Sequence, residues 1–303
     1  MLAIVIPYYK LSFFEAALKS LSLQTDKQFK VYIGDDASQE NPTDLLEKFR
    51  DKFEFVYHRF DSNIGQKCLV KQWGRCIALT EDEEWIMILG DDDELSENCI
   101  EDFYSNLPEI KHYDCNVVRY ATIINDVVHK KLSITYTHPS LEKSTDFFYR
   151  RFTNQTRSSL SEYIFKKSAW KKHGFYNYNL AWHADDRAWL EFSEFKYIYS
   201  INSSHVIFRL SKENISRGGY KIKEKQKVTL QFYKFFIVRH LYRFSRYQRK
   251  DFLLYYEQLI YKNNKRTLFF WILLFLLFLA NFYIVQSIKF TRRFLINRRR
   301  DGE

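Results

Sequence analysis

The regular alternation of strand-like and helix-like segments is the feature that most restricts how this chain can fold. Short apolar runs rich in β-branched residues are typical of buried strands. These runs cover residues 2–9, 29–38, 53–60 and 84–93, with helix-like segments over residues 12–25, 43–50 and 66–80 between them. Strands that alternate with helices through short connections predict an α/β fold with a mainly parallel sheet and helices on both faces.

The pattern becomes less regular in the second half of this region. The later elements expected from it are a strand hairpin over residues 116–126 and 130–138, a helix capped at Gly174, a helix over residues 183–195 and a pair of strands over residues 196–210. Near the start of the chain, Ser12 and Glu15 have capping-box spacing, so Ser12 is expected to cap the first helix.

Acidic and aromatic residues and one proline stand at the carboxyl ends of three strand-like segments, where each group follows directly after the predicted strand. They are Pro7 and Tyr9 in the segment at 2–9, Asp35 and Asp36 in the segment at 29–38, and Asp91, Asp92 and Asp93 in the segment at 84–93. Ligands of parallel α/β sheets bind beyond the carboxyl ends of the strands. We therefore expect these segments to converge on one edge of the sheet and to form a ligand site there.

Asp91, Asp92 and Asp93 form an acidic turn, called here the aspartate turn, directly after an apolar run. Three adjacent carboxylates repel one another and would be costly in an apolar interior unless a cation met them. Mg²⁺ usually takes one or two carboxylates together with phosphate oxygens, and Gly90 permits a tight backbone here. The functional interpretation is a Mg²⁺ or Mn²⁺ ion between the turn and a diphosphate, and a solvated turn is the alternative.

Two carboxylate pairs elsewhere in the chain also have a functional and a structural interpretation. Asp35 and Asp36 can accept hydrogen bonds from a nucleotide base, or form an Asx-type turn before a helix. Asp185 and Asp186 stand at the expected start of a helix, where acidic residues favour the helix dipole in any case. A carboxylate at that place can also act as the base that deprotonates a sugar hydroxyl.

Residues 1–215 resemble the family 2 glycosyltransferases, which have the GT-A fold of a nucleotide-sugar-binding α/β domain. The resemblance is carried in chain order by "AIVIPYY", "LSLQT", "VYIGDDAS", "NIG" at 63–65, "MILGDDDEL" and "HADD". These segments are similar to the family's opening V-S-V-I-I-P-x-Y-N strand and to its D-D-G-S, N-x-G, D-x-D and E-D motifs.

The resemblance implies a role for each matching residue. It assigns the nucleotide-sugar donor to Pro7, Tyr9, Asp35, Asp36, Asn63, Gly65 and Asp91. It assigns the metal to Asp92 and Asp93, and catalysis to Asp186 as the base, with Asp185 positioning the acceptor. An enzyme of this type inverts the anomeric carbon in a single displacement by the acceptor hydroxyl.

Four departures from the family pattern affect the metal and donor sites. Gly90 replaces the first acid of the D-x-D motif, Ala37 replaces the glycine of D-D-G-S, and Asp185 replaces the glutamate of the E-D pair. Arg209 is kept near the end of the domain without the histidine that often follows it. His205 is a candidate for the missing ligand, although a histidine of the core or the surface is the simpler interpretation.

The net charge of +10 is divided unevenly along the chain. Residues 217–266 hold 14 Lys and Arg against 3 Asp and Glu, residues 267–288 hold no charged residue, and residues 289–303 hold 6 against 2. Residues 1–216 therefore carry a net charge of −5. We expect a catalytic domain (1–216), a basic amphipathic helical region (217–266), an apolar helix (267–288) and a basic tail (289–303).

The basic and apolar regions predict association with a membrane. Residues 228–244 mix aromatic and aliphatic residues with basic ones, which favours anionic lipid; no nucleic-acid motif accompanies the charge. The 22 residues at 267–288 would form a helix of about 33 Å, long enough for a hydrocarbon core of about 30 Å. Basic residues on both flanks favour a re-entrant helix over a simple transmembrane span. We expect the protein at the cytoplasmic face of the cell membrane.

These observations favour a membrane-associated, metal-dependent glycosyltransferase that moves a sugar from a UDP-sugar to a lipid-linked or polysaccharide acceptor. A nucleotidyltransferase is one alternative, although no Gly-rich, Lys-bearing phosphate loop follows the first strand. A membrane adaptor that kept the fold without the activity is another. Cys68, Cys76, Cys99 and Cys115 lack the spacing of a metal site, and no signal peptide opens the chain, so we expect reduced thiols in the cytosol.

Overall fold

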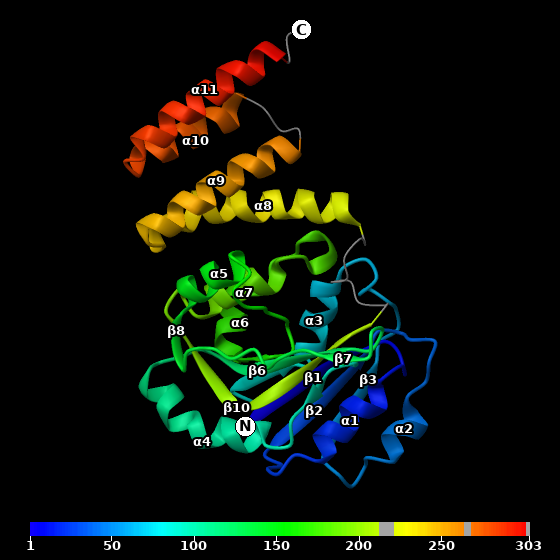
Figure 1. Ribbon diagram of the computed structural model, residues 1–303. Helices are drawn as coiled ribbons and strands as arrows, with labels where there is room; N and C mark the ends of the chain where they lie inside the picture. The colour runs from blue at the N-terminus through cyan, green and yellow to red at the C-terminus, as the bar shows by residue number, and fades with distance from the viewer. Residues whose placement is uncertain (212–220, 264–267, 301–303) are drawn as a thin grey trace. The chain divides into compact units, whose positions relative to one another are not determined.

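A mixed sheet organises the first of two compact units, Met1–Tyr220 and Lys221–Glu303 (Figure 1). The computed structural model describes residues 1–211, 221–263 and 268–300. In the described part of the first unit, the ten strands of the sheet are β1 (Leu2–Tyr8), β2 (Phe29–Asp35), β3 (Glu54–Arg59), β4 (Trp85–Ile88), β5 (Glu94–Leu95), β6 (Val117–Asp126), β7 (Lys131–Leu132), β8 (Leu141–Lys143), β9 (Tyr163–Lys166) and β10 (Tyr197–Leu210).

Seven α-helices accompany these strands within the described residues of the first unit. They are α1 (Phe14–Ser22), α2 (Thr43–Glu47), α3 (Leu69–Ile77), α4 (Cys99–His112), α5 (Ser144–Phe152), α6 (Lys167–His173) and α7 (Ala184–Phe192). The second unit consists of α8 (Ile222–His240), α9 (Arg246–Lys262), α10 (Leu268–Ala280) and α11 (Ile284–Arg300), with a 3₁₀ turn after α8.

Half of the sheet has the parallel arrangement that the sequence predicts. The strand order is β3-β2-β1-β4-β9-β6-β10-β5, and β3, β2, β1 and β4 pair in parallel. Beyond them, β9 is antiparallel to both β4 and β6, whereas β10 is parallel to β6. The fold class is therefore confirmed as α/β, with a sheet that is mixed on the β9–β5 side.

The strand ends converge on one edge of the sheet, as the alternation predicts. Tyr8 pairs in register with Asp35, and the backbone N–H of Asp36 donates to the carbonyl of Tyr8 at 3.1 Å. The next residue, Tyr9, donates its backbone N–H to Oδ2 of Asp91 at 2.9 Å. Residues that are far apart in the chain thus become neighbours at the carboxyl ends of β1, β2 and β4.

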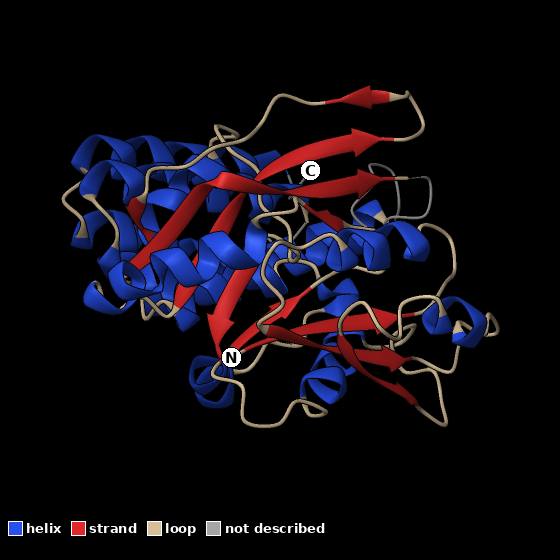
Figure 2. Ribbon diagram, turned by 90° about the horizontal axis from the view of Figure 1, so that it is seen from below, coloured by secondary structure: helices blue, strands red, loops and turns tan. Residues whose placement is uncertain are grey.

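Helices cover both faces of this sheet (Figure 1), and the strands form one twisted layer in the view of Figure 2. Successive side chains of a strand point to opposite faces. Ile4 of β1 accordingly belongs to one core with Leu18 of α1 and Phe103 of α4, whereas Val5 belongs to another with Trp73 of α3. Apolar residues on both faces of β1 explain why its sequence is a continuous apolar run.

Several local predictions for this unit are confirmed. β6 and β7 form the expected hairpin, although β7 is short. α6 ends at His173, and the capping residue Gly174 adopts a left-handed φ of 63°. All four cysteines are free thiols, and three of them are buried.

Two local predictions are wrong. α1 begins at Phe14 without a side-chain cap from Ser12, because Phe13 adopts a left-handed φ of 70° and its ring lies 4.3 Å from the guanidinium of Arg209. The expected pair of strands over residues 196–210 is the single strand β10, which pairs along β6 with a register shift between Ile201 and His205. Both outcomes depend on tertiary contacts that a local pattern does not contain.

The second unit corrects the prediction for residues 267–288. The apolar stretch does not form one helix: α10 ends at Ala280, Phe282 adopts a left-handed φ of 58°, and α11 begins at Ile284. No helix in the described residues is both long and apolar enough to cross a membrane. The expected basic tail continues α11, and the expected start of the basic region, residues 217–220, lies outside the described residues.

Specific contacts hold α11 against α10 and α9 in this unit. Trp271 of α10 packs against the rings of Phe290 and Phe294 of α11, at centroid distances of 4.9 and 4.8 Å. Arg293 of α11 donates two hydrogen bonds of 2.7 Å to the buried carboxylate of Glu257 on α9. α11 is therefore held by an aromatic contact to α10 and a bidentate ion pair to α9.

Gly34 of β2 marks a close approach between the sheet and α3, and it yields a test of this packing. A Cβ at Gly34 would lie 2.4 Å from Sγ of Cys76. Gly34→Ala should lower the free energy of unfolding by about 1–3 kcal/mol, because overpacking forces neighbours to shift. Urea denaturation measures this change, and Cys76→Ala in the same chain should recover most of it.

Gly74→Ala is the matched control for this prediction. A Cβ at Gly74, inside α3, would meet no atom within 4 Å. The substitution should therefore stabilise the protein by up to about 1 kcal/mol through helix propensity. Equal effects of the two substitutions would contradict the packing described for Gly34.

Candidate active site

A cavity of about 490 Å³ lies at the carboxyl ends of β1 and β4, and both acidic clusters border it. The aspartate turn forms one side, and Asp185 and Asp186 of α7 contribute from another part of the chain. Basic and aromatic groups share the lining: Lys10, Arg151, Arg157, Trp73, Trp182, His183 and Phe208. Residues separated by about ninety positions in the sequence therefore face one space.

The aspartate turn is held in place by hydrogen bonds to its own carboxylates. Oδ2 of Asp91 accepts from the backbone N–H groups of Tyr9 at 2.9 Å and Lys10 at 3.2 Å. Asp93 is buried, and its two oxygens accept from the backbone N–H of Arg209 at 2.9 Å and from the hydroxyl of Ser161. The turn is thus tied to the end of β1, to β10 and to the segment before β9.

The charges of the turn act on one another. Burial, followed by the charge of Asp92, raises the pKa of Asp91 to about 6 and that of Asp93 to about 7. Such shifts indicate carboxylates that are crowded together in poorly solvated surroundings. A cation at the turn would relieve this repulsion.

The side chain of Arg209 braces the turn from β10. Its Nε donates to the carbonyl of Asp92 at 2.9 Å, and its guanidinium forms an ion pair with Glu94. The absence of a side chain at Gly90 has a steric explanation, because a Cβ there would lie 3.1 Å from carboxylate oxygens of both Asp92 and Asp93. The glycine that departs from the family motif therefore leaves room for the two carboxylates that follow.

The donor set of the turn fits a divalent cation bound partly by substrate. Among the residues that the structure describes, no group of three His, Cys, Asp or Glu side chains could hold a metal ion by itself. Mg²⁺ in substrate complexes commonly takes one or two carboxylates, and phosphate and water oxygens complete its shell. Both oxygens of Asp93 already accept hydrogen bonds, so direct contact of Asp93 with an ion would compete with these donors.

His205, the candidate for the missing ligand, is not among the residues that border this cavity. It belongs to β10, where its backbone exchanges hydrogen bonds with Ser96. Burial lowers its pKa. The simpler interpretation, a structural histidine, accords with this position.

Asp35 and Asp36 are not among the residues that border the cavity, and protein groups donate hydrogen bonds to both carboxylates. Asp36 accepts from the backbone N–H groups of Ile64 at 2.8 Å and Gly65 at 2.9 Å, and it pairs with Arg75. It therefore fixes the loop at 63–65 that the family resemblance assigns to the donor. The sequence suggested that Asp36 and the loop at 63–65 share one site, but it did not show that they contact each other.

Asp35 is fully buried and has a different set of partners. Its carboxylate accepts from the hydroxyl of Tyr57 at 2.6 Å, from Arg59 at 3.0 Å and from the backbone of Ser38 at 2.7 Å. Tyr9, by contrast, exposes its side chain. Asp35 thus links the end of β2 to β3 and to the turn that follows, whereas the ring of Tyr9 is open to solvent.

Asp185 and Asp186 occupy the first turn of α7, after a segment of unusual backbone geometry. Leu180, Ala181 and His183 all adopt left-handed φ angles, of 60°, 51° and 65°. Non-glycine residues in this region are strained, and such strain concentrates at functional sites. The geometry places His183 Nδ1 2.8 Å from Oδ2 of Asp186.

The two carboxylates of this pair differ in their protonation. Burial, followed by the charge of Asp186, raises the pKa of Asp185 to about 7. Burial also opposes ionisation of Asp186, but the hydrogen bond from His183 and the charge of Arg151 hold its pKa below the usual value. Asp186 is therefore the member of the pair that ionises more readily.

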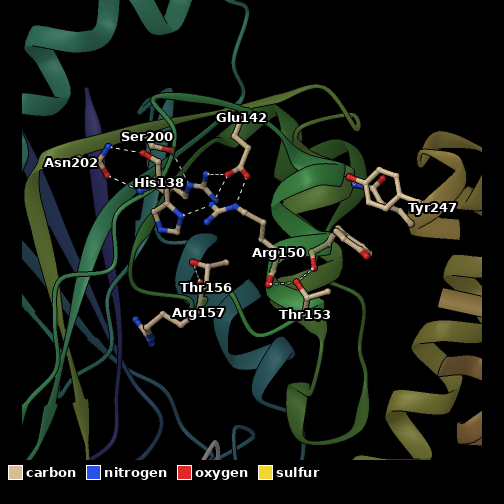
Figure 3. A network of polar contacts seen from close by, with 12 residues as sticks. His138, Glu142, Arg150, Thr153, Thr156, Arg157, Ser200, Asn202 and Tyr247 are labelled. Carbon is tan, nitrogen blue, oxygen red and sulfur yellow. Dashed lines mark hydrogen bonds and ion pairs between the residues drawn. The ribbon is translucent and has the colours of Figure 1, made fainter. Parts of the chain in front are cut away.

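A buried ion network anchors the helix that carries Arg151 (Figure 3). Glu142 accepts hydrogen bonds of 2.7 and 2.8 Å from Arg150 of α5 and also pairs with the fully buried Arg119 of β6. Arg150 further contacts Nδ1 of His138 at 3.2 Å. The next residue, Arg151, borders the cavity, so the network fixes the position from which Arg151 acts on Asp186.

His138 is neutral in this network. Burial, followed by the charges of the surrounding arginines, lowers its pKa to about 2. Its backbone N–H donates to Asn202 at 3.0 Å, and Asn202 donates back to its carbonyl at 2.8 Å. A neutral imidazole can accept the hydrogen bond from Arg150 without adding a further positive charge.

The family model for "Glycosyl transferase family 2" matches residues 3–172, which is more than half of the chain. The chain belongs to glycosyltransferase family 2. The resemblance drawn from the strand-end motifs is thereby confirmed, and the fold is the GT-A-like α/β fold that it implies. No curated protein sequence matches the chain.

Solved structures of S. aureus TarS are similar to this family 2 chain in fold. TarS residues 1–349 in complex with UDP-GlcNAc superpose with a TM-score of 0.63 at 14% identity, over 86% of this chain and 72% of that one. A longer TarS structure gives a TM-score of 0.62 at 15% identity, over 86% of this chain and 43% of that one. At this identity the likeness concerns the fold alone.

Within this glycosyltransferase, sequence reasoning missed the arginines that surround the predicted aspartates. Arg59 is the last residue of β3, so the strand-end argument that identified Asp35 could also have identified Arg59. Arg75, Arg151 and Arg157 lie on helices or loops without a local motif. Only the tertiary structure brings them to the acidic residues.

Proposed function

We propose that the chain is an inverting glycosyltransferase that moves a sugar from a UDP-sugar to a hydroxyl group of a lipid-linked or polysaccharide acceptor. One observation carries the proposal: the aspartate turn and the Asp185–Asp186 pair border the same cavity. Family membership supports glycosyl transfer, and binding of UDP-GlcNAc by TarS supports a uridine nucleotide. The donor would enter past Pro7, Tyr9, Asp36, Asn63 and Gly65.

In the proposed reaction, the acceptor oxygen attacks the anomeric carbon from the face opposite the diphosphate. The new glycosidic bond forms as the bond between that carbon and the diphosphate oxygen breaks, and UDP leaves with the bonding electrons. Asp186 takes the proton of the acceptor hydroxyl, while Asp185 positions the acceptor. The hydrogen bond from His183 orients the Asp186 carboxylate throughout.

The proposed cofactor is Mg²⁺ or Mn²⁺, held by Asp92 with Asp91 or Asp93 of the aspartate turn. When bound, a divalent cation neutralises the negative charge that develops on a departing diphosphate. Arg209 keeps the turn in the required shape through the carbonyl of Asp92.

Asp186→Asn tests the assignment of the base. A positioned base contributes roughly 10²–10⁴-fold, so the variant should lose that much in kcat while its affinity for UDP is unchanged. Release of UDP from UDP-sugars measures the first quantity, and calorimetric titration measures the second. Asp114→Asn, at an exposed residue paired with Lys196, is the control and should keep wild-type activity. A drop in UDP affinity at unchanged kcat would remove Asp186 from the acceptor side.

Asp92→Asn tests the metal. The variant should be nearly inactive, and EDTA should silence the wild-type enzyme until Mg²⁺ or Mn²⁺ is restored, because the leaving diphosphate would lack its counter-ion. UDP release in defined metal buffers provides the measurement. Wild-type rates in EDTA would show that the reaction proceeds without a divalent cation.

Two other functions would show themselves in the same assays. A nucleotidyltransferase would release diphosphate from a nucleoside triphosphate, which the family assignment disfavours. An inactive adaptor would release no UDP from any UDP-sugar although its cavity residues are intact.

We also propose that the second unit binds anionic lipid, which would hold the enzyme at the cytoplasmic face of the cell membrane. α10, α11 and the turn between them expose large apolar side chains, namely Leu268, Phe269, Ile272, Leu276, Phe282, Ile284, Val285 and Ile288. Exposed apolar surface of this extent is uncommon in soluble monomers. Basic residues on the same elements, among them Lys289 and Arg292, match the charge of an anionic leaflet.

Vesicle binding by the full chain tests the lipid proposal. The protein should sediment with vesicles that contain phosphatidylserine and far less with pure phosphatidylcholine, and salt should release only part of it. Phe282→Ser with Ile288→Ser should weaken binding at high salt at least tenfold, because each buried side chain contributes about 1.5–3 kcal/mol. Leu132→Ser with Ile134→Ser, at exposed residues of the first unit, should change nothing. Equal effects of the two double variants would refute the assignment to α10 and α11.

A further inference from the structure

We propose that Arg157 forms an anion subsite within the active-site cavity and binds a phosphate group there. The inference rests on the proposed function, since Arg157 borders the same cavity as Asp92 and Asp186. Arg157 belongs to the loop between α5 and β9, where no sequence motif draws attention to it. Its side chain is only 14% exposed, so its place at the cavity is built into the fold.

A buried carboxylate holds this guanidinium in one orientation. Glu162 is fully buried, and its Oε2 accepts from Nη1 of Arg157 at 2.9 Å, from Thr122 at 2.8 Å and from Ser159 at 2.9 Å. The guanidinium also lies 4.6 Å above the ring of Phe208. An arginine held by both contacts loses little further freedom when a ligand binds.

Most of the hydrogen-bonding capacity of Arg157 is left for a ligand. A guanidinium has five N–H donors. Within the part of the chain that the structure describes, Arg157 donates to Glu162 alone. Figure 3 shows its side chain directed away from the network of Glu142, Arg150 and His138, so that network does not use it.

The composition of the cavity explains why a phosphate would need this group. Five aspartates border the cavity, and they would repel a phosphate that entered without a cation to meet it. Arg151 already acts on Asp185 and Asp186. The charge of Arg157 also lowers the pKa of Asp93, but among the described residues Arg157 donates its hydrogen bond to Glu162 and to none of the aspartates, so its planar fork can donate two parallel hydrogen bonds to phosphate oxygens.

The phosphate can come from two sources with the same chemistry. It is either the diphosphate of the donor or a phosphate carried by the acceptor. The first source predicts that Arg157 contributes to UDP binding, and the second predicts a phosphate site that persists when UDP is bound.

Arg157→Gln combined with Glu162→Gln provides the test, because the double change leaves no uncompensated carboxylate in the core. Calorimetry with UDP and with uridine forms one arm. Thermal unfolding of the UDP-saturated enzyme with inorganic phosphate or with matched chloride forms the other. Charge-assisted hydrogen bonds predict a loss of about 10–100-fold in affinity for the bound phosphate.

Each outcome decides the matter. A loss of UDP affinity with uridine binding unchanged supports the subsite and assigns it to the donor diphosphate. Unchanged UDP affinity, with the phosphate-induced rise in Tm lost, supports it and assigns it to the acceptor. Wild-type behaviour in both arms overturns the proposal. If the wild type binds no UDP, the uridine donor is wrong. The subsite is then tested by whether inorganic phosphate raises the Tm of the nucleotide-free wild type more than that of the double variant.

Two further variants control this experiment. Arg157→Lys keeps the charge without the planar fork and should give an intermediate loss of affinity. Arg50→Gln combined with Glu47→Gln removes an exposed ion pair of the same composition and should leave both arms at wild-type values. A loss in this control equal to that in the double variant would mean that loss of an ion pair anywhere in the chain is responsible, which also overturns the subsite.

Discussion

The carboxylate of Asp93 is the contact on which the geometry of the cavity depends. It lies in the turn after β4, yet it accepts its hydrogen bonds from Arg209 of β10 and from Ser161 before β9. β9 pairs with β4, whereas β6 lies between β9 and β10 in the sheet, so one buried side chain ties three parts of the first unit together. Burying a carboxylate is unfavourable unless donors compensate it. The fold must therefore bring both donors into place, and Asp91 and Asp92 then take their positions at the cavity.

Carboxylates also fix arginines elsewhere in the first unit, and three of these carboxylates, Asp36, Glu142 and Glu162, are buried. The pairs are Arg75 with Asp36, Arg150 with Glu142, Arg157 with Glu162 and Arg209 with Glu94. Buried ion pairs add little net stability, because desolvation offsets most of their attraction. Loss of one partner is costly, at about 3–5 kcal/mol, because the other charge remains buried. We infer that these pairs serve to position groups rather than to raise stability.

The second unit has a surface of a different chemical character. Its helices carry exposed aromatic and aliphatic side chains together with basic ones, whereas the first unit gathers its acidic side chains around a cavity. The turn at Phe282 divides the apolar stretch, and Trp271 on its first half packs against Phe290 of α11. The residues proposed to bind lipid lie in the second unit, and all those proposed for catalysis lie in the first.

The sequence by itself determined the α/β class, the parallel strands β1 to β4 and the family, because these follow from local apolar periodicity and from short motifs at strand ends. It also identified Asp92 and Asp186 as candidates, since acidic residues after strands and at helix starts are visible locally. Only the tertiary structure decided that β10 is one strand, that residues 267–288 contain a turn, and that Arg157 borders the same cavity as the aspartates. The physical reason is that such features depend on contacts between distant residues, whose free energy is set by burial and charge pairing and leaves no periodic mark in the chain.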